Sequence, residues 1–143
     1  MHQRFAILHH TVGQELDRTD QSHWDWLFEV GDSLRTWASP VIESWIEIQV
    51  PCQPLADHRR QYLDYEGPLG GGRGSVSRVA SGIYTTIDQS DERFEVQIQW
   101  TLNTAAGPLP RTAEALFQRM VVQPDSLRAD QRGRWSLRLS PGW

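Results

Sequence analysis

Strict alternation of apolar and polar residues constrains the fold of this 143-residue chain more than any other feature. In residues 93–102 every second side chain is apolar, and these are Phe94, Val96, Ile98, Trp100 and Leu102. Such alternation is typical of an antiparallel strand with one face buried and the other in solvent. Residues 45–50 repeat the pattern, which predicts a second strand of the same kind.

Further strands are predicted along the chain, at residues 4–10, 22–30, 33–38, 76–87 and 134–139. Residues 30–33 are typical of a hairpin turn. One helix is predicted: Thr112 is a suitable N-cap, and Ala113, Leu116, Phe117 and Met120 follow at helical spacing before residues 121–122 favour a strand. We therefore expect one mainly all-β domain over residues 1–143, an antiparallel barrel or sandwich with one or two short helices.

Composition excludes several functions. The 14 basic residues are all arginine, which excludes Schiff-base and lysyl-nucleotide chemistry, and the net charge of −4 argues against a general nucleic-acid coat. Cys52 is the only cysteine, so no internal disulfide forms, and a buried or incidental thiol is favoured over a nucleophile. Without a membrane-length apolar run or a signal-peptide pattern, we expect a soluble, cytoplasmic protein with no membrane partner, and we favour a monomer.

A candidate metal site begins in the strand at residues 22–30. His23 and Asp25 share one face of that strand, about 6.5 to 7 Å apart, so both can lean onto one ion. An imidazole and a carboxylate suit Mn²⁺ or Zn²⁺, and a third ligand must come from elsewhere. His10, at the end of the first strand, is the natural candidate. The alternative is an ordinary surface pair.

A second polar cluster occurs at residues 57–62. If this segment is extended, His58, Arg60 and Tyr62 project to one side and together offer donors for a phosphate oxyanion. The alternative is a solvated edge strand.

The glycine-rich residues 66–74 do not have the lysine and following helix of a phosphate-binding loop. They favour a mobile hairpin connection, from which Arg73 can still reach a phosphate.

The chain resembles a known family at several places. Residues 23–29 read His-Trp-Asp-Trp-Leu-Phe-Glu, and residues 34–40 read Leu-Arg-Thr-Trp-Ala-Ser-Pro. Residues 57–67 read Asp-His-Arg-Arg-Gln-Tyr-Leu-Asp-Tyr-Glu-Gly, and residues 133–137 read Gly-Arg-Trp-Ser-Leu. These blocks, with the first strand ending in histidine, resemble the 3′-phosphoesterase domain of bacterial DNA ligase D.

The resemblance implies a small antiparallel β-barrel, with one or two short helices, that stands alone and processes 3′ ends of DNA or primer-template junctions in break repair. It would remove a terminal ribonucleoside or a 3′ phosphate with a divalent metal, usually Mn²⁺, with Zn²⁺ or Co²⁺ as alternatives. It implies His10, His23 and Asp25 as metal ligands, and His58 and Tyr62 as the residues on the phosphate. We further expect Arg59 or Arg60 to bind the DNA backbone, and a separate ligase or polymerase of end joining as a partner.

Four departures from the family pattern leave alternatives open. Leu27 replaces a phosphate-binding arginine, Val41 replaces a lysine, about seven residues are inserted within residues 12–21, and the family's N-terminal arm is lacking. Arg60 or Arg73 are candidates to compensate. One alternative is a catalytically impaired relative that binds nucleic-acid ends or a repair protein without turnover. The other is a small-molecule phosphatase, which the acidic composition suits.

Overall fold

The structure, a computed structural model, describes residues 2–11, 22–71, 73–120 and 134–142. The elements in chain order are β1 (Gln3–Thr11), β2 (His23–Val30), β3 (Ser33–Pro40), β4 (Ile48–Arg59), the 3-10 turn η2 (Arg60–Leu63), β5 (Gly67–Pro68), β6 (Ser75–Gln89), β7 (Arg93–Thr104), β8 (Gly107–Arg119) and β9 (Trp135–Pro141).

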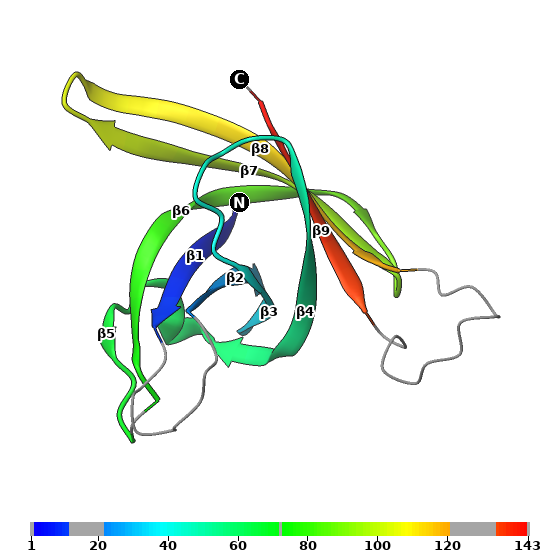
Figure 1. The fold of residues 1–143 in the computed structure, drawn as a ribbon, viewed down its shortest axis with the longest axis horizontal. Helices are drawn as coiled ribbons and strands as arrows, with labels where there is room; N and C mark the ends of the chain where they lie inside the picture. Colours follow the sequence, from blue (N-terminus) through cyan, green and yellow to red (C-terminus); the bar gives the residue numbers. More distant parts are fainter. Residues whose placement is uncertain (1, 12–21, 72, 121–133, 143) are drawn as a thin grey trace.

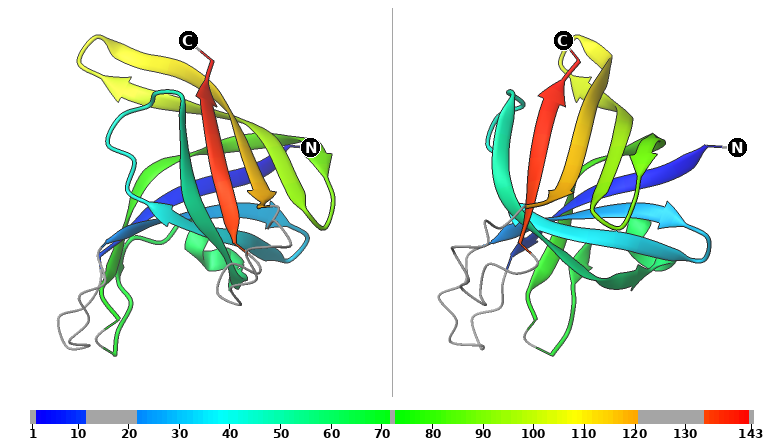
Figure 2. Two further views of the ribbon diagram at one scale, coloured as in Figure 1. Left: turned by 45° about the vertical axis from the view of Figure 1, so that its right-hand side comes forward. Right: turned by 90° about the vertical axis from the view of Figure 1, so that its right-hand side faces the viewer.

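The strands form a closed antiparallel β-barrel, which confirms the expected fold class and excludes the sandwich. Their order is β1-β2-β3-β4-β9-β8-β7-β6-β5, and β1 also pairs with β6, which closes eight strands and leaves β5 as an extra strand. Closure depends on the long, curved β6, whose first part pairs with β1 and whose last part pairs with β7 (Figures 1 and 2). The hairpin of β7 and β8 projects beyond the barrel (Figure 1).

The turn between β2 and β3 confirms the predicted hairpin. Val30 and Ser33 face each other across the ladder, so Gly31 and Asp32 make a two-residue connection. Gly31 has a φ of 59°, a conformation that residues with a side chain rarely adopt.

The helix predicted from Thr112 is wrong, because this segment lies within β8. Ala113, Ala115 and Phe117 are buried at alternate positions, and Phe117 faces Phe94 of β7 and Leu137 of β9. Pairing on both sides overrides the helical spacing of the apolar residues. Residues 121–122 lie outside the described part of the chain. No described helix is long and apolar enough to cross a membrane.

The strand predicted at residues 45–50 begins later than expected. β4 starts at Ile48 and continues to Arg59, through two prolines. Trp45 precedes the strand and packs its ring against Trp24 and Trp100, with ring centroids 6.0 Å and 4.6 Å apart.

Aromatic rings dominate the main core. Phe28 makes edge-to-face contacts with Tyr84, Phe94 and Phe117 at centroid distances of 5.1, 5.2 and 5.7 Å. Trp37 stacks on Phe117 at 4.8 Å. Such ring pairs add to the stabilisation that burial itself provides.

A second apolar cluster covers the opposite face of β1 and β2. It consists of Ala6, Leu8, Leu27, Leu34, Leu63 and Val76, with Leu63 contributed by η2. Because both faces of β1 and β2 are packed, the backbone of this wall is held from two sides. The candidate site lies at one end of β1 and β2, on the face of these strands that carries the second cluster.

Candidate metal and phosphate site

An open pocket of about 930 Å³ lies beside the second cluster. Its polar lining includes His10, His23, Asp25, His58 and Tyr62, the five residues predicted to bind metal and phosphate. They come from β1, β2, β4 and η2, so the fold brings together side chains that are distant in the sequence.

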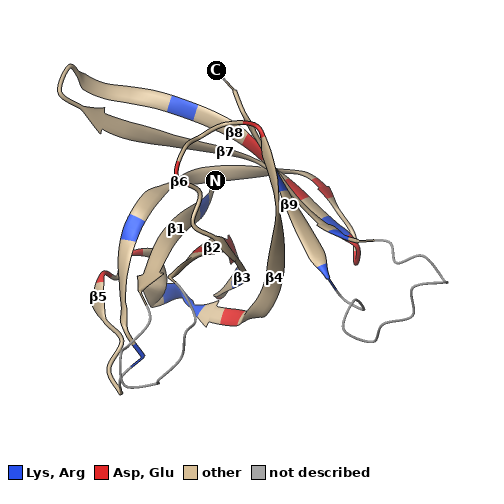
Figure 3. Cartoon of the chain, in the orientation of Figure 1, with Lys and Arg blue, Asp and Glu red and all other residues tan. Residues whose placement is uncertain are grey.

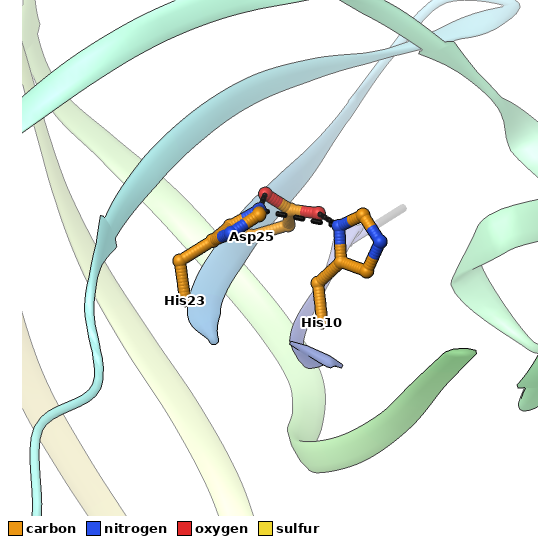
Figure 4. Close-up of side chains that lie close together, drawn as sticks. All are labelled: His10, His23 and Asp25. Atoms are coloured by element: carbon orange, nitrogen blue, oxygen red, sulfur yellow. Dashed lines mark hydrogen bonds and ion pairs between the residues drawn. The ribbon is translucent and has the colours of Figure 1, made fainter. Parts of the chain in front are cut away.

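Three of these side chains meet at the ends of β1 and β2 (Figure 4). His10 and His23 face each other directly across the ladder, and Asp25 follows two residues later on the same face of β2. His10 Nδ1 lies 3.3 Å from His23 Nε2 and 3.7 Å from Asp25 Oδ2. His23 Nε2 lies 3.1 Å from Asp25 Oδ1.

The environment of Asp25 fits a bound cation. The residue is only 5% exposed, and its Oδ1 makes no hydrogen bond of suitable geometry with the described residues, although His23 Nε2 lies 3.1 Å away. A buried carboxylate oxygen without a well-aligned hydrogen bond is costly, and a bound metal ion would remove that cost. The separations among the three side chains are close to the roughly 3.0 to 3.5 Å expected for two ligands each about 2.1 Å from one ion.

The donor set narrows the choice of ion. Two imidazoles and one carboxylate suit Mn²⁺, Zn²⁺ or Co²⁺ better than Ca²⁺ or Mg²⁺, which favour oxygen ligands. Three protein ligands leave coordination positions open to a substrate. His10, His23 and Asp25 are therefore the residues that could hold a metal.

His58 and Tyr62 line the same pocket, with ring centroids 5.9 Å apart. The condition that residues 57–62 are extended holds only as far as Arg59, where β4 ends, because η2 begins at Arg60. His58 Nδ1–H donates to the carbonyl oxygen of Ala56 over 3.0 Å, since a carbonyl can only accept. This leaves Nε2 of His58 for contact with a ligand.

The prediction that Arg60 shares a face with His58 and Tyr62 is wrong. Its guanidinium lies 2.5 Å from Glu29 and also donates to the carbonyl of Gly31. The tight 3-10 turn directs Arg60 away, and it is not among the described lining residues of the pocket.

The other two predicted arginines differ in position. Arg59 is exposed at the end of β4, opposite Ser33, and lies outside the described pocket lining. Arg73 does line the pocket, but its guanidinium donates to the carbonyls of Leu69 and Gly70 at 2.6 and 3.2 Å. Neither guanidinium makes a contact with the three candidate ligands.

Leu27 does not obstruct the pocket. It is fully buried in the second cluster and is not part of the described lining. Val41 is 37% exposed just after β3 and is also outside the lining. The predicted insertion at residues 12–21 lies outside the described residues.

The apolar wall of the pocket was not predicted. Pro51, Cys52 and Leu55 of β4 contribute to it. The alternation along residues 48–55 resembles that of any half-buried strand, so the sequence holds no signal for this role. Burial raises the pKa of the Cys52 thiol to about 12, which agrees with the prediction of an unreactive cysteine.

Charged residues are interspersed along the described strands (Figure 3). Several arginines are paired with acidic side chains, including Arg4 with Asp64 at 2.6 Å and Arg93 with Asp88 at 3.0 Å. The hydrogen bond and ion pair to Arg4 lower the pKa of the Asp64 carboxyl group. Such pairing reduces the positive charge available to an anionic ligand.

No protein-family model matches the chain, and no curated protein matches it.

Proposed function

We propose that the protein is a divalent-metal-dependent phosphoesterase that acts on 3′ ends of DNA. The observation that carries this proposal is the presence of the triad His10, His23 and Asp25 in one pocket with His58 and Tyr62. The resemblance to the ligase D phosphoesterase supports the choice of DNA 3′ ends as substrate.

The chain's own residues have separate roles in this reaction. A divalent cation bound by the triad would hold phosphate oxygens and offset their charge. Tyr62 donates a hydrogen bond from its hydroxyl and positions the phosphate. Protonated His58 donates the Nε2 proton to the leaving 3′ oxygen as the phosphorus–oxygen bond breaks. Water supplies the new oxygen on phosphorus; one of its protons stays on the released phosphate and the other passes through solvent to reprotonate His58.

Release of phosphate from a 3′-phosphorylated primer-template in the presence of Mn²⁺ tests this function. We expect His23→Ala and His58→Ala each to lower the rate by about 10² to 10⁴. His2→Ala, at an exposed position outside the described pocket lining, is the matched control and should keep the wild-type rate. Binding of the DNA by the wild-type protein without release would contradict catalysis and favour a non-catalytic end-binding relative.

The arrangement of the arginines favours a second candidate, a phosphatase of small molecules. Arg60 is paired with Glu29, and Arg73 is bonded within its own turn, so Arg59 is the remaining predicted contact for a DNA backbone. Affinity for polynucleotides depends on arginine and lysine contacts to successive phosphates. Turnover of small phosphomonoesters, with no release from the primer-template, would support this candidate against the first.

A further inference from the structure

A backbone carbonyl determines which nitrogen of His10 faces the other two candidate ligands. Nε2 of His10 lies 2.9 Å from the carbonyl oxygen of Arg73. Because a carbonyl only accepts, the single proton of the neutral imidazole must be on Nε2. Nδ1 then carries a lone pair, and it is the nitrogen that faces His23 and Asp25.

The turn that presents this carbonyl is held by specific bonds. Leu69 N–H donates to the carbonyl of Gly74 over 2.8 Å, and Arg73 N–H donates to that of Gly70 over 3.1 Å. The backbone has a positive φ at Gly70, Gly71 and Gly74, of 78°, 57° and 92°, where a side chain would be strained. Gly70, Gly71 and Gly74 are thus required by the shape of the turn.

The side chain of Arg73 closes the same turn. Its Nη2 and Nε donate to the carbonyls of Leu69 and Gly70, so the guanidinium binds the start of the turn while the carbonyl of the same residue faces His10. Hydrogen-bond partners of this kind orient metal-binding histidines and fix their tautomer.

We propose that Arg73 is a positioning residue for the metal ligand His10, in place of the phosphate contact expected from the sequence. Its carbonyl holds His10 in the Nε2–H tautomer with Nδ1 as the ligand atom, and its guanidinium keeps the carbonyl in place. This inference rests on the metal site of the proposed function.

The tautomer can be measured on the metal-free protein by long-range ¹H–¹⁵N NMR of the histidine rings, at a pH where the spectrum itself shows the His10 ring to be neutral. We expect His10 in the Nε2–H form in the wild-type protein and a mixture of tautomers in Arg73→Ala. His10 in the Nδ1–H form would overturn the proposal whether or not the protein binds metal.

Metal affinity gives the second readout, with Mn²⁺ alone as the probe and free Mn²⁺ measured by electron paramagnetic resonance. Arg73→Ala should weaken binding by about 10- to 100-fold, and Arg73→Lys should restore part of it because an ammonium group can still donate to Leu69. Arg138→Ala, an exposed arginine on β9, is the control and should bind as the wild type does. The proposal would be overturned if Arg73→Ala bound Mn²⁺ as tightly as the wild type does but bound inorganic phosphate more weakly. That result would show that Arg73 contacts phosphate, as the sequence suggested.

A pair of substitutions at His10 identifies the ligand atom. The side-chain amide introduced by His10→Asn reaches about the position of Nδ1, whereas the amide introduced by His10→Gln reaches about that of Nε2. We expect His10→Asn to bind Mn²⁺ at least about tenfold more tightly than His10→Gln. The reverse order would overturn Nδ1 ligation. If Mn²⁺ binding is normal in the wild-type protein but no phosphate is released, the proposed reaction fails independently of this inference.

Discussion

Replacement of Leu27 tests whether the departure from the family's arginine is a change in packing or a loss of a phosphate contact. Leu27 is fully buried in the second cluster, between β1, β2 and η2. An arginine at this position would lose its contact with water. Glu29, two residues further along the same face, is already paired with Arg60. We therefore expect Leu27→Arg to destabilise the protein without creating a phosphate-binding group.

The size of the effect follows from burial. Truncation of a fully buried leucine in Leu27→Ala costs about 2 to 5 kcal/mol of unfolding free energy, and an unpaired buried charge in Leu27→Arg costs at least as much. The entropy of unfolding is about 2.1 cal/mol/K per residue, or about 0.3 kcal/mol/K for a chain of 143 residues. A loss of about 3 kcal/mol therefore lowers Tm by about 10 °C.

Thermal unfolding followed by tryptophan fluorescence and circular dichroism measures this change. The control is Leu102→Ala, because Leu102 is 43% exposed on β7 and its truncation should change stability by no more than about 0.5 kcal/mol. Phosphate release by folded Leu27→Arg is measured below its Tm. A Leu27→Arg variant with the wild-type Tm and a faster release of phosphate would refute the argument that this position belongs to the core.

Three further predictions concern single side chains. Mn²⁺ at about 100 times its Kd should stabilise the wild-type protein by about 2.7 kcal/mol, which raises Tm by about 9 °C in thermal-shift measurements. Asp25→Asn should abolish this increase without lowering the Tm of the metal-free protein. The raised pKa of Cys52, about 12, keeps the thiol protonated at pH 8. Its alkylation by iodoacetamide should therefore be at least about 100-fold slower than that of free cysteine, and the rate should rise as the pH approaches 12. A rate equal to that of free cysteine would show that the thiol is exposed. Arg60→Ala removes the ion pair to Glu29, whose carboxylate keeps the hydrogen bond from Arg4 N–H, and should cost about 1 kcal/mol by urea unfolding while phosphate release changes less than about threefold. A large loss of activity at unchanged stability would show that Arg60 contributes to the site.

The period-two alternation was sufficient to predict antiparallel strands with one buried face, but it left a barrel and a sandwich open, because closure depends on the pairing of β1 with β6. It failed at residues 112–120, where Ala113, Leu116 and Phe117 satisfy both a helical and a strand pattern. There the outcome depends on pairing with β7 and β9, which are distant contacts that no local window contains. β4 was only partly predicted, because its prolines interrupt the signal of a strand that continues to Arg59.

The candidate site was predictable to the extent that it follows from alternation within a strand. The shared face of His23 and Asp25 is a property of β2 alone. The prediction of His10 as the third ligand depended only on locating the end of β1 correctly. The placement of Arg60 was not predictable, because it depends on the change from extended backbone to a 3-10 turn after Arg59. The hydrogen bond from His10 to the carbonyl oxygen of Arg73 involves a backbone atom, so it could not be predicted from the type of residue at either position.

The ladder between β1 and β2 links the stability of the fold to the geometry of the site. Side chains on one face of this pair enter the aromatic core, while the other face of β1 carries Ala6 and Leu8 in the second cluster, followed by the candidate ligand His10. A slip of one residue in β1 would exchange His10 for His9 and would move every apolar side chain of the strand to the wrong face. Burial of the two faces therefore opposes the same slip that would separate His10 from His23. The energy that fixes the register of the barrel also holds the buried carboxylate of Asp25 beside two imidazoles, an arrangement that is favourable when a cation is bound there.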